Sequence, residues 1–434
     1  MKVFKFGGAS VRDAAGIKNL ARIVSKEKTE LVIVVSAFGK TTNALEKVLK
    51  LWLAGDNDYK NHLETVYSYH SGVAGDLFHD VNPAQSKIDD SFSILKKYLR
   101  SAKPGDYDYE YDQIVSNGEI WSTIIISEFL KKSGLDVEWT DIRKSLVTDN
   151  RFRDANIIWD ESQKRINEVF NFNLHKFYLT QGFIGATISG ESTTLGREGS
   201  DYTAAILANI LDAESVTVWK DVPGLLNADP KWLHDAEKLE EVSYREAVEM
   251  TFSGAKVIHP KTIKPLQNKN IPLFVKSFIN PEKEGTLVTE EPNLKKIIPV
   301  FVRKENQVLL SLLPKDFSFV MGDNLSRMFH SFMQHGIKVN LVDASAVSIN
   351  VCVDDDRAKI DNLLFDLKDE YSAVYNENVE VLSVRHYNEE AIGRIITGRE
   401  VLLEQRTRSM VRFVTKQSVA NSTNYRSNSS RCPL

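Results

Sequence analysis

The sequence is poor in cysteine, and its two cysteines, Cys352 and Cys432, stand far apart in the chain. Neither belongs to a CxxC motif or a Cys/His cluster, which excludes a disulfide framework and a thiolate zinc site. No apolar run approaches the roughly 20 residues that a membrane-spanning helix needs. The first residues also lack the basic start and apolar core of a signal peptide. We therefore expect a cytoplasmic protein with no membrane partner.

An excess of either charge is also missing. The 55 Lys and Arg residues nearly balance the 59 Asp and Glu residues, and the formal net charge is −4. Nucleic-acid binding driven by a global basic excess is thereby excluded, and we expect no nucleic-acid partner. With 42% hydrophobic residues, the 434-residue chain can form globular cores. At roughly 150 residues per domain, it should contain two or three domains.

Strand and helix patterns alternate through the first two thirds of the chain. Residues 31–35 form a continuous β-branched apolar run, as expected of a parallel strand covered on both faces. Residues 42–132 have mainly helical spacing, and the alternation resumes at 176–184 and continues to 272–275. This order predicts an α/β domain with a mostly parallel sheet.

The pattern changes near residues 280–299, where prolines and a glycine interrupt a charged stretch and favour a domain boundary. Residues 307–367 then read as strand, helix, strand, strand and helix, which is typical of a small ferredoxin-like unit. Residues 379–415 begin a similar pattern but lack its final helix. The polar segment 417–434, without acidic residues, predicts a disordered tail.

Three glycine-rich segments follow expected strands, at the edge where open α/β sheets bind ligands. They are Lys5–Ser10, Thr193–Tyr202 and Trp219–Pro230. Glycine amides, a helix N-terminus and a lysine together suit an anion. Neither the GxxxxGK[ST] nor the GxGxxG pattern is present. From the residues alone, a plain turn at Lys5 and simple helix capping by Ser200 and Asp201 remain open.

Six motifs follow one another along the chain: Lys5-Phe6-Gly7-Gly8, Ser36 to Asn43, Ser116-Asn117-Gly118-Glu119, Thr193 to Asp201, Asp221-Val222-Pro223-Gly224 and Gly254 to Pro260. This is the order seen in aspartate kinases, and over residues 1–416 the chain resembles a monofunctional aspartokinase of the amino acid kinase superfamily. The resemblance implies an αβα-sandwich kinase domain followed by ferredoxin-like ACT regulatory subdomains. The expected domain boundaries are 1–295 for the kinase domain, 299–306 plus 377–416 for a shortened outer ACT subdomain, 307–372 for an inserted ACT subdomain and 417–434 for the disordered tail.

The resemblance also implies a reaction: ATP phosphorylates the side-chain carboxylate of L-aspartate, the first step of lysine, threonine and methionine biosynthesis. Magnesium would arrive with the nucleotide, and no metal site is assigned to the protein. Lys5, Asp201 and Lys256 would be catalytic. The nucleotide would contact Lys5, Gly7, Gly8, Lys220, Asp221, Leu226, Lys231, Lys256 and Val257, and the amino acid would contact Ser36, Thr42, Glu119, Phe183, Arg197 and Ser200. ACT pairing implies a homodimer or a higher homo-oligomer.

The sequence departs from the family pattern at several positions. Ala9 stands where threonine is usual, and Lys220 and Leu226 replace a common threonine and tyrosine. In the inserted ACT subdomain, Asn340, Ala344 and Ala346 replace more polar or acidic residues of lysine-sensitive relatives, which predicts weak or absent inhibition by lysine. The alternatives are a kinase for glutamate or acetylglutamate and an inactive amino-acid sensor.

Overall fold

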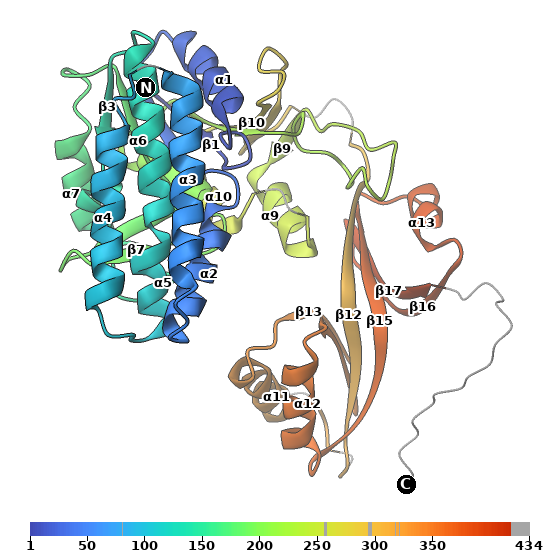
Figure 1. Cartoon of the computed structure of the whole chain (residues 1–434). Coiled ribbons are helices and arrows are strands. Elements are labelled where there is room, and N and C mark those ends of the chain that lie inside the picture. Colours follow the sequence, from blue (N-terminus) through green and yellow to red (C-terminus); the bar gives the residue numbers. More distant parts are fainter. Residues whose placement is uncertain (80, 256–257, 294–296, 317, 321, 418–434) are drawn as a thin grey trace, which may run out of the picture. The chain divides into compact units, whose positions relative to one another are not determined.

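The computed structural model describes residues 1–417 apart from 80, 256–257, 294–296, 317 and 321; the segment 418–434, nearly all of the predicted tail, lies outside the described residues. The chain divides into two compact units (Figure 1). The first contains Met1–Leu226, Glu237–Thr251 and Lys256–Lys295, and the second contains Asn227–Ala236, Phe252–Ala255 and Lys296–Leu434. Two short segments from within the predicted kinase range 1–295 thus belong to the second unit.

An eight-stranded sheet forms the core of the first unit. In spatial order its strands are β3 (Val137–Thr140), β5 (Phe177–Gln181), β2 (Leu31–Val35), β1 (Lys2–Phe6), β8 (Ser215–Lys220), β10 (Leu273–Ser277), β11 (Thr286–Thr289) and β9 (Glu241–Ser243). The pairings from β3 to β10 are all parallel, and β10 pairs with β11 antiparallel. Every residue of β2 and β5 is buried, because helices cover both faces of a parallel sheet. The predicted α/β class is confirmed.

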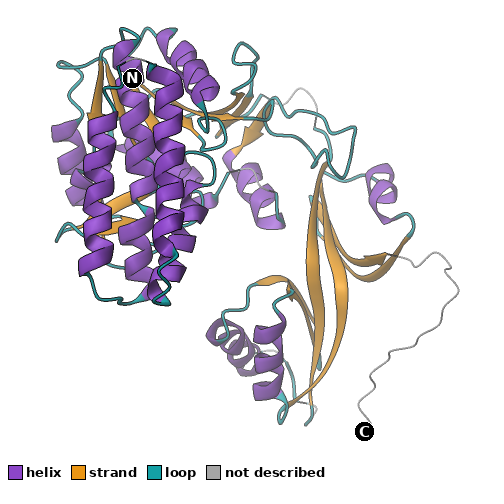
Figure 2. Cartoon of the chain, viewed as in Figure 1, coloured by secondary structure: helices purple, strands orange, loops and turns teal. Residues whose placement is uncertain are grey.

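Helices form a layer on each side of this sheet (Figure 2). The first layer contains α1 (Ala14–Ser25), α2 (Thr41–Leu53), α3 (Tyr59–Phe78), α4 (Gln85–Ser101), α5 (Tyr107–Val115) and α6 (Asn117–Lys132), with α6 against β2, β3 and β5. The second contains α7 (Trp159–Val169), α8 (Gly199–Ile210) and α10 (Pro260–Gln267), with α8 against β1, β2 and β8. The helical region predicted for 42–132 is therefore confirmed.

Three shorter elements complete the wall of the first unit near α8. They are the strands of a small sheet, β4 (Val147–Thr148), β6 (Ile184–Thr187) and β7 (Ser192–Thr194). The segment predicted as one strand, 176–184, is divided into β5 and β6, because the chain turns at residues 182–183, where Phe183 has φ +71°. A further helix, α9 (Tyr244–Ser253), follows β9.

The second unit contains one continuous antiparallel sheet of six strands. In spatial order they are β13 (Val339–Ala344), β14 (Ile349–Asp354), β12 (Val300–Pro314), β15 (Tyr371–Arg385), β17 (Met410–Gln417) and β16 (Arg399–Arg406). The first strand expected in the segment 307–367 is part of a longer strand, β12, which begins at Val300 and whose register against β15 shifts between Lys304 and Leu309.

Three helices pack on this sheet: α11 (Asp323–Gln334), α12 (Arg357–Leu367) and α13 (Glu389–Ile396). Two of them, α11 and α12, cover an apolar cluster that includes Leu310 and Ile349, whereas α13 covers one that includes Phe301 and Leu382. Trp232 and Leu233 of the segment 227–236 pack against the α13 cluster. This segment therefore contributes apolar side chains to the core beneath α13.

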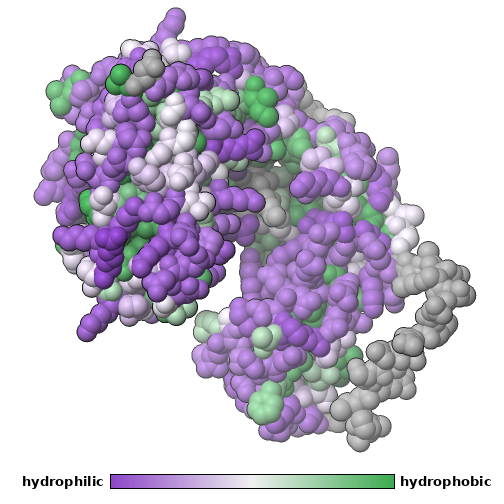
Figure 3. Space-filling model, viewed as in Figure 1, coloured by the Kyte–Doolittle hydropathy of each residue, from purple (hydrophilic) through white to green (hydrophobic). Residues whose placement is uncertain are grey.

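The surface seen in Figure 3 is mainly hydrophilic, with apolar side chains scattered over it. Among the described residues, no helix is both long enough and apolar enough to cross a membrane.

Candidate active site

A pocket of about 820 Å³ opens in the first unit where β1, β2 and β8 end. Parallel strands bring their carboxyl ends to one edge of a sheet, so loops distant in sequence meet there. The three glycine-rich segments singled out in the sequence all contribute to its lining. Predicted site residues in the lining are Lys5, Gly7, Gly8, Ser36, Thr42, Glu119, Phe183, Arg197, Ser200, Asp201, Lys220 and Asp221.

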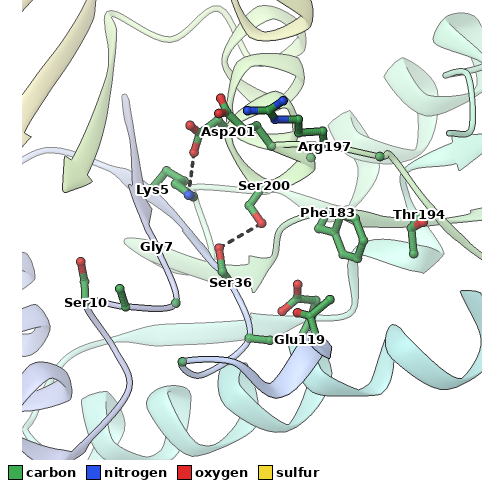
Figure 4. A pocket seen from close by; sticks show the side chains of 18 of the residues that line it. Lys5, Gly7, Ser10, Ser36, Glu119, Phe183, Thr194, Arg197, Ser200 and Asp201 are labelled. Carbon is green, nitrogen blue, oxygen red and sulfur yellow. Dashed lines mark hydrogen bonds and ion pairs between the residues drawn. The ribbon is translucent and has the colours of Figure 1, made fainter. Parts of the chain in front are cut away.

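One end of the pocket, which we call the Lys5 end, is built around an ion pair (Figure 4). The Lys5 ammonium lies 2.6 Å from Oδ1 of Asp201, and Lys220 Nζ lies 3.7 Å from Oδ2 of the same carboxylate. Burial alone would raise the pKa of Asp201, but the charges of Lys5 and Lys220 outweigh it and lower the pKa. Two cations thus share one ionised carboxylate, which fixes their positions at this end of the pocket.

The chain passes closely over itself beside Lys5. The Gly8 carbonyl accepts a hydrogen bond of 2.9 Å from the Gly39 amide, and a Cβ atom on Gly8 would collide with the carbonyl oxygen of Ala37. A side chain therefore does not fit at residue 8. The glycine therefore lets residues 37–39 pack directly against the chain beside Lys5, which fixes the backbone of this part of the pocket.

Ser200 and Asp201 do not cap α8, so the simple capping interpretation is wrong. The helix begins one residue earlier, at Gly199, and its N-cap is Glu198 in the left-handed conformation, with φ +55°. Ser200 and Asp201 consequently lie in the first helical turn with their side chains directed into the pocket. Ser36 donates a hydrogen bond of 3.0 Å to Ser200, which links β2 to α8 across the middle of the pocket (Figure 4).

The opposite end, which we call the Glu119 end, contains Glu119, Phe183 and Thr194, whereas Arg197 lies on the Asp201 side of the pocket (Figure 4). Glu119 projects from the first turn of α6, is 3% exposed, and its Oε2 atom has no hydrogen-bond partner among the described residues. Burial raises the pKa of Glu119 to about 8, although the Ala37 amide and the charge of Lys5 oppose the rise. A buried carboxyl group with an unused oxygen suits the ammonium of a ligand, and Arg197 elsewhere in the lining suits a carboxylate of the same ligand.

Four predicted nucleotide contacts are not brought into this pocket by the described structure. Leu226 is partly buried and pairs with Lys238, away from the lining. Lys231 is exposed and belongs to the segment 227–236 of the second unit. Lys256 and Val257 lie outside the described residues, so their roles stay predictions.

Several pocket residues at the Glu119 end were not predicted from the sequence. They include Tyr111, Arg153, Asp154 and Thr194. Behind them, buried Asp112 accepts hydrogen bonds from the amides of Arg153 and Thr194 and from the Thr194 hydroxyl, at 3.0, 2.8 and 2.7 Å. Their separation in sequence and the lack of a glycine motif around Arg153 explain why they were missed.

No group of three or more His, Cys, Asp or Glu side chains able to hold a metal ion occurs within the part of the chain that the structure describes. The carboxylates at the Lys5 end are Asp201 and Asp221. They could contact a cation that arrives bound to a polyphosphate, because such ions are usually held by one or two carboxylates plus the phosphates.

Comparisons with known proteins agree with this geometry. The model of the amino acid kinase family matches residues 1–277. A lysine-sensitive aspartokinase 3 of Escherichia coli is 32% identical over 356 residues, which cover 81% of this chain and 78% of that protein. A chloroplastic bifunctional aspartokinase/homoserine dehydrogenase 2 of Arabidopsis thaliana is also 32% identical, but this chain spans only 39% of its length.

Solved structures give the same result for the fold. Aspartokinase III of E. coli, in complex with aspartate and ADP, superposes with a TM-score of 0.81 at 27% identity, over 96% of both chains. An aspartate kinase of Clostridium acetobutylicum superposes with a TM-score of 0.77, and at 19% identity it supports the fold alone. The chain belongs to the amino acid kinase family and, within it, to the aspartokinases.

Proposed function

We propose that this protein transfers the γ-phosphoryl group of ATP to the side-chain carboxylate of L-aspartate, forming 4-phospho-L-aspartate and ADP. The observation that carries the proposal is the asymmetry of the pocket. Its Lys5 end places two lysines around Asp201, and its Glu119 end offers a buried carboxyl group with an unpaired oxygen. A polyphosphate suits the first end and an α-amino acid the second.

The chemistry requires little from general acids or bases. The attacking group is a carboxylate with a free pKa of about 4, so it is already ionised at neutral pH. One of its oxygens forms a bond to the γ-phosphorus while the bond to the bridging oxygen breaks, and that oxygen leaves with the ADP. The main obstacle is repulsion between two anions, which positioned cations reduce. Lys5 and Lys220 supply such cations, and Asp201 fixes their positions.

The residues around Glu119 would hold the amino acid. Arg197 would bind the α-carboxylate with its planar guanidinium, and Glu119 would accept the α-ammonium. Ser36, Thr42, Phe183 and Ser200 would complete the pocket, and all four are in its lining. The acceptor carboxylate would then point toward Lys5.

The nucleotide would occupy the Lys5 end. Its phosphates would contact Lys5 and the Gly7 and Gly8 amides, with Lys220 and Asp221 nearby. Contacts to Leu226, Lys231, Lys256 and Val257 remain predictions from the resemblance. Magnesium bound to ATP would neutralise part of the phosphate charge, and Asp201 and Asp221 are the carboxylates placed to face it.

Kinases of related amino acids remain the alternative. One methylene group separates aspartate from glutamate and is worth only about 1–3 kcal/mol of discrimination. Acetylglutamate fits less well, because its acylated nitrogen carries no charge to compensate the unpaired Oε2 of Glu119. An inactive sensor would have no use for the ion pair of Lys5 with Asp201.

The test is an ADP-release assay with L-aspartate, L-glutamate and N-acetylglutamate as acceptors. We expect turnover with aspartate to exceed that with the other two, and Lys5→Ala to lower it by orders of magnitude while the protein remains folded. Turnover that prefers glutamate or survives in Lys5→Ala would contradict the proposal.

For the second unit we propose ACT-type regulation and a homodimer or higher homo-oligomer. Strands β13 and β16 form the two edges of its sheet. Lysine inhibition should be weak, because the Asn340 side chain is already occupied by Lys304 at 2.7 Å, Gln307 at 2.7 Å and Asp354 at 2.9 Å. A monomer in light scattering at micromolar concentration would refute the oligomer.

The domain boundaries, the cytoplasmic location and the role in lysine, threonine and methionine biosynthesis stay predictions.

A further inference from the structure

Arg153 lines the pocket but has no part in the function proposed above. Its backbone has φ +67°, in the left-handed region that L side chains adopt rarely and glycine adopts without strain. A loop that needed only this turn would be better served by glycine. Such an outlier beside a pocket suggests that the side chain itself has a function.

The loop that carries Arg153 is held firmly at its base. The Asp149 amide donates to the Asn156 carbonyl at 2.9 Å, and the Asp149 carboxylate accepts from the Asn156 amide at 2.9 Å. The Arg153 amide donates to Asp112 at 3.0 Å, and Asp112 also binds Thr194 of the pocket wall. The backbone of Arg153 is therefore fixed to the wall of the Glu119 end.

The loop also approaches the segment that carries Arg197. Gly196 has φ +75°, and a Cβ atom there would lie 2.7 Å from an Asp154 carboxylate oxygen and 3.2 Å from the Arg153 carbonyl oxygen. The glycine therefore permits close packing between the two loops. As a result, Arg153 and Arg197 reach the same pocket from neighbouring segments.

The side chain of Arg153 is positioned by two rings and one carboxylate. Its guanidinium carbon lies 4.7 Å from the ring centroid of Tyr111 and 5.3 Å from that of Tyr107. Its Nη1 atom lies 3.0 Å from Asp108 Oδ1. With 44% of the side chain exposed, the guanidinium remains accessible to a ligand entering beside Tyr111, which also lines the pocket.

We propose that Arg153 is a specificity-determining residue that adds a second guanidinium to the pocket, beside that of Arg197, and favours an amino acid bearing two carboxylates. With Arg197 and Lys5 it would balance the two negative charges of such a substrate while Glu119 pairs with the ammonium. The inference rests on the proposed function, because it assigns the Glu119 end to the amino acid.

The test compares steady-state kinetics of the full-length protein with those of Arg153→Gly and Arg153→Lys. Arg153→Gly relieves the backbone strain and removes the charge, so KM for L-aspartate should rise about fivefold while kcat and KM for ATP change less than twofold. Arg153→Lys keeps the charge and should show a smaller rise. Raising the salt concentration should increase KM for aspartate in the wild type more than in Arg153→Gly.

The matched control is Arg151→Gln, which removes a cation from the same loop at a residue that does not line the pocket and whose side chain is 68% exposed. This variant should keep the wild-type KM. Unchanged KM for aspartate in Arg153→Gly, or an equal rise in KM for ATP, would overturn the proposal. A third result would also overturn it: KM for aspartate rises as much in Arg153→Lys as in Arg153→Gly, and the rise accompanies a loss of thermal stability. That pattern would indicate a purely structural role for Arg153.

Should Arg153→Gly fail to fold, Arg153→Asn provides the same comparison, since asparagine tolerates the left-handed conformation. The outcomes separate this inference from the proposed function. A wild-type protein without aspartate-dependent ADP release contradicts the function itself. An active wild type whose Arg153 variants keep its KM for aspartate contradicts only the role of Arg153.

Discussion

The buried carboxyl group of Glu119 should make binding of the amino acid strongly dependent on pH. Burial raises its pKa to about 8, so in the empty pocket the group is mainly protonated at neutral pH. The protonated form cannot pair with the α-ammonium of a substrate. Binding therefore requires loss of this proton, and affinity should increase as the pH rises toward 8.

The size of the effect follows from the ionised fraction. With a pKa of about 8, roughly one tenth of Glu119 is ionised at pH 7 and roughly one hundredth at pH 6. Because apparent affinity scales with the competent fraction, Kd for L-aspartate should fall about tenfold between pH 6 and pH 7. Above pH 8, where Glu119 is mainly ionised, Kd should change little with pH.

Isothermal titration calorimetry of L-aspartate from pH 6 to 8.5 would measure this dependence. Repeating it in buffers of different ionisation enthalpy at pH 7 should show release of nearly one proton per amino acid bound. Glu119→Gln should bind weakly, with a flat profile and no proton release. A wild-type Kd that is constant over this range would refute the reasoning.

The same group predicts an effect on stability. Between its ordinary pKa of 4.5 and about 8, the folded protein retains a proton that the unfolded chain has lost, so the empty protein loses stability as the pH rises. The full difference corresponds to about 5 kcal/mol. Glu119→Gln removes this penalty, and its thermal stability should exceed that of the wild type at pH 8 and match it near pH 4.5.

Three further predictions concern other parts of the molecule. Gly8→Ala should lower kcat/KM about 100-fold in steady-state assays, because the new methyl group collides with the Ala37 carbonyl and displaces the backbone beside Lys5; wild-type kinetics would contradict this role of the glycine. Asp112→Asn should destabilise the fold by about 2 kcal/mol in chemical unfolding, since two amides and a hydroxyl lose their shared carboxylate. It should also raise KM for aspartate more than KM for ATP, and equal rises in the two KM values would contradict this prediction. Activity titrated with lysine should show little inhibition, and strong inhibition below millimolar lysine would contradict the interpretation of Asn340.

The first unit was largely predictable because its signals are local. The β-branched run at 31–35, the helical spacing of 42–132 and the glycines after β1 each specify an element within a few residues. Parallel strands then bring the ends of those elements to one edge of the sheet. The order of the motifs was therefore enough to gather most of the pocket.

The features that were missed depend on contacts distant in sequence. Asp112 joins Arg153 and Thr194 through hydrogen bonds between separate segments, and no local pattern marks the left-handed turn at Arg153. The extension of β12 back to Val300 depends on its pairing with β15, which no pattern within residues 299–313 reveals. The association of 227–236 with the α13 cluster depends on apolar contacts between segments far apart in the sequence.

The proposed reaction makes an acyl phosphate from L-aspartate in this pocket. The most direct measurement is to trap the product with hydroxylamine, which converts an acyl phosphate to a hydroxamate, in reactions containing ATP, magnesium and L-aspartate. We expect aspartyl hydroxamate to form in step with ADP in the wild type, and almost none to form with Lys5→Ala. ADP release without hydroxamate, or hydroxamate formed equally well by Lys5→Ala, would contradict this reaction.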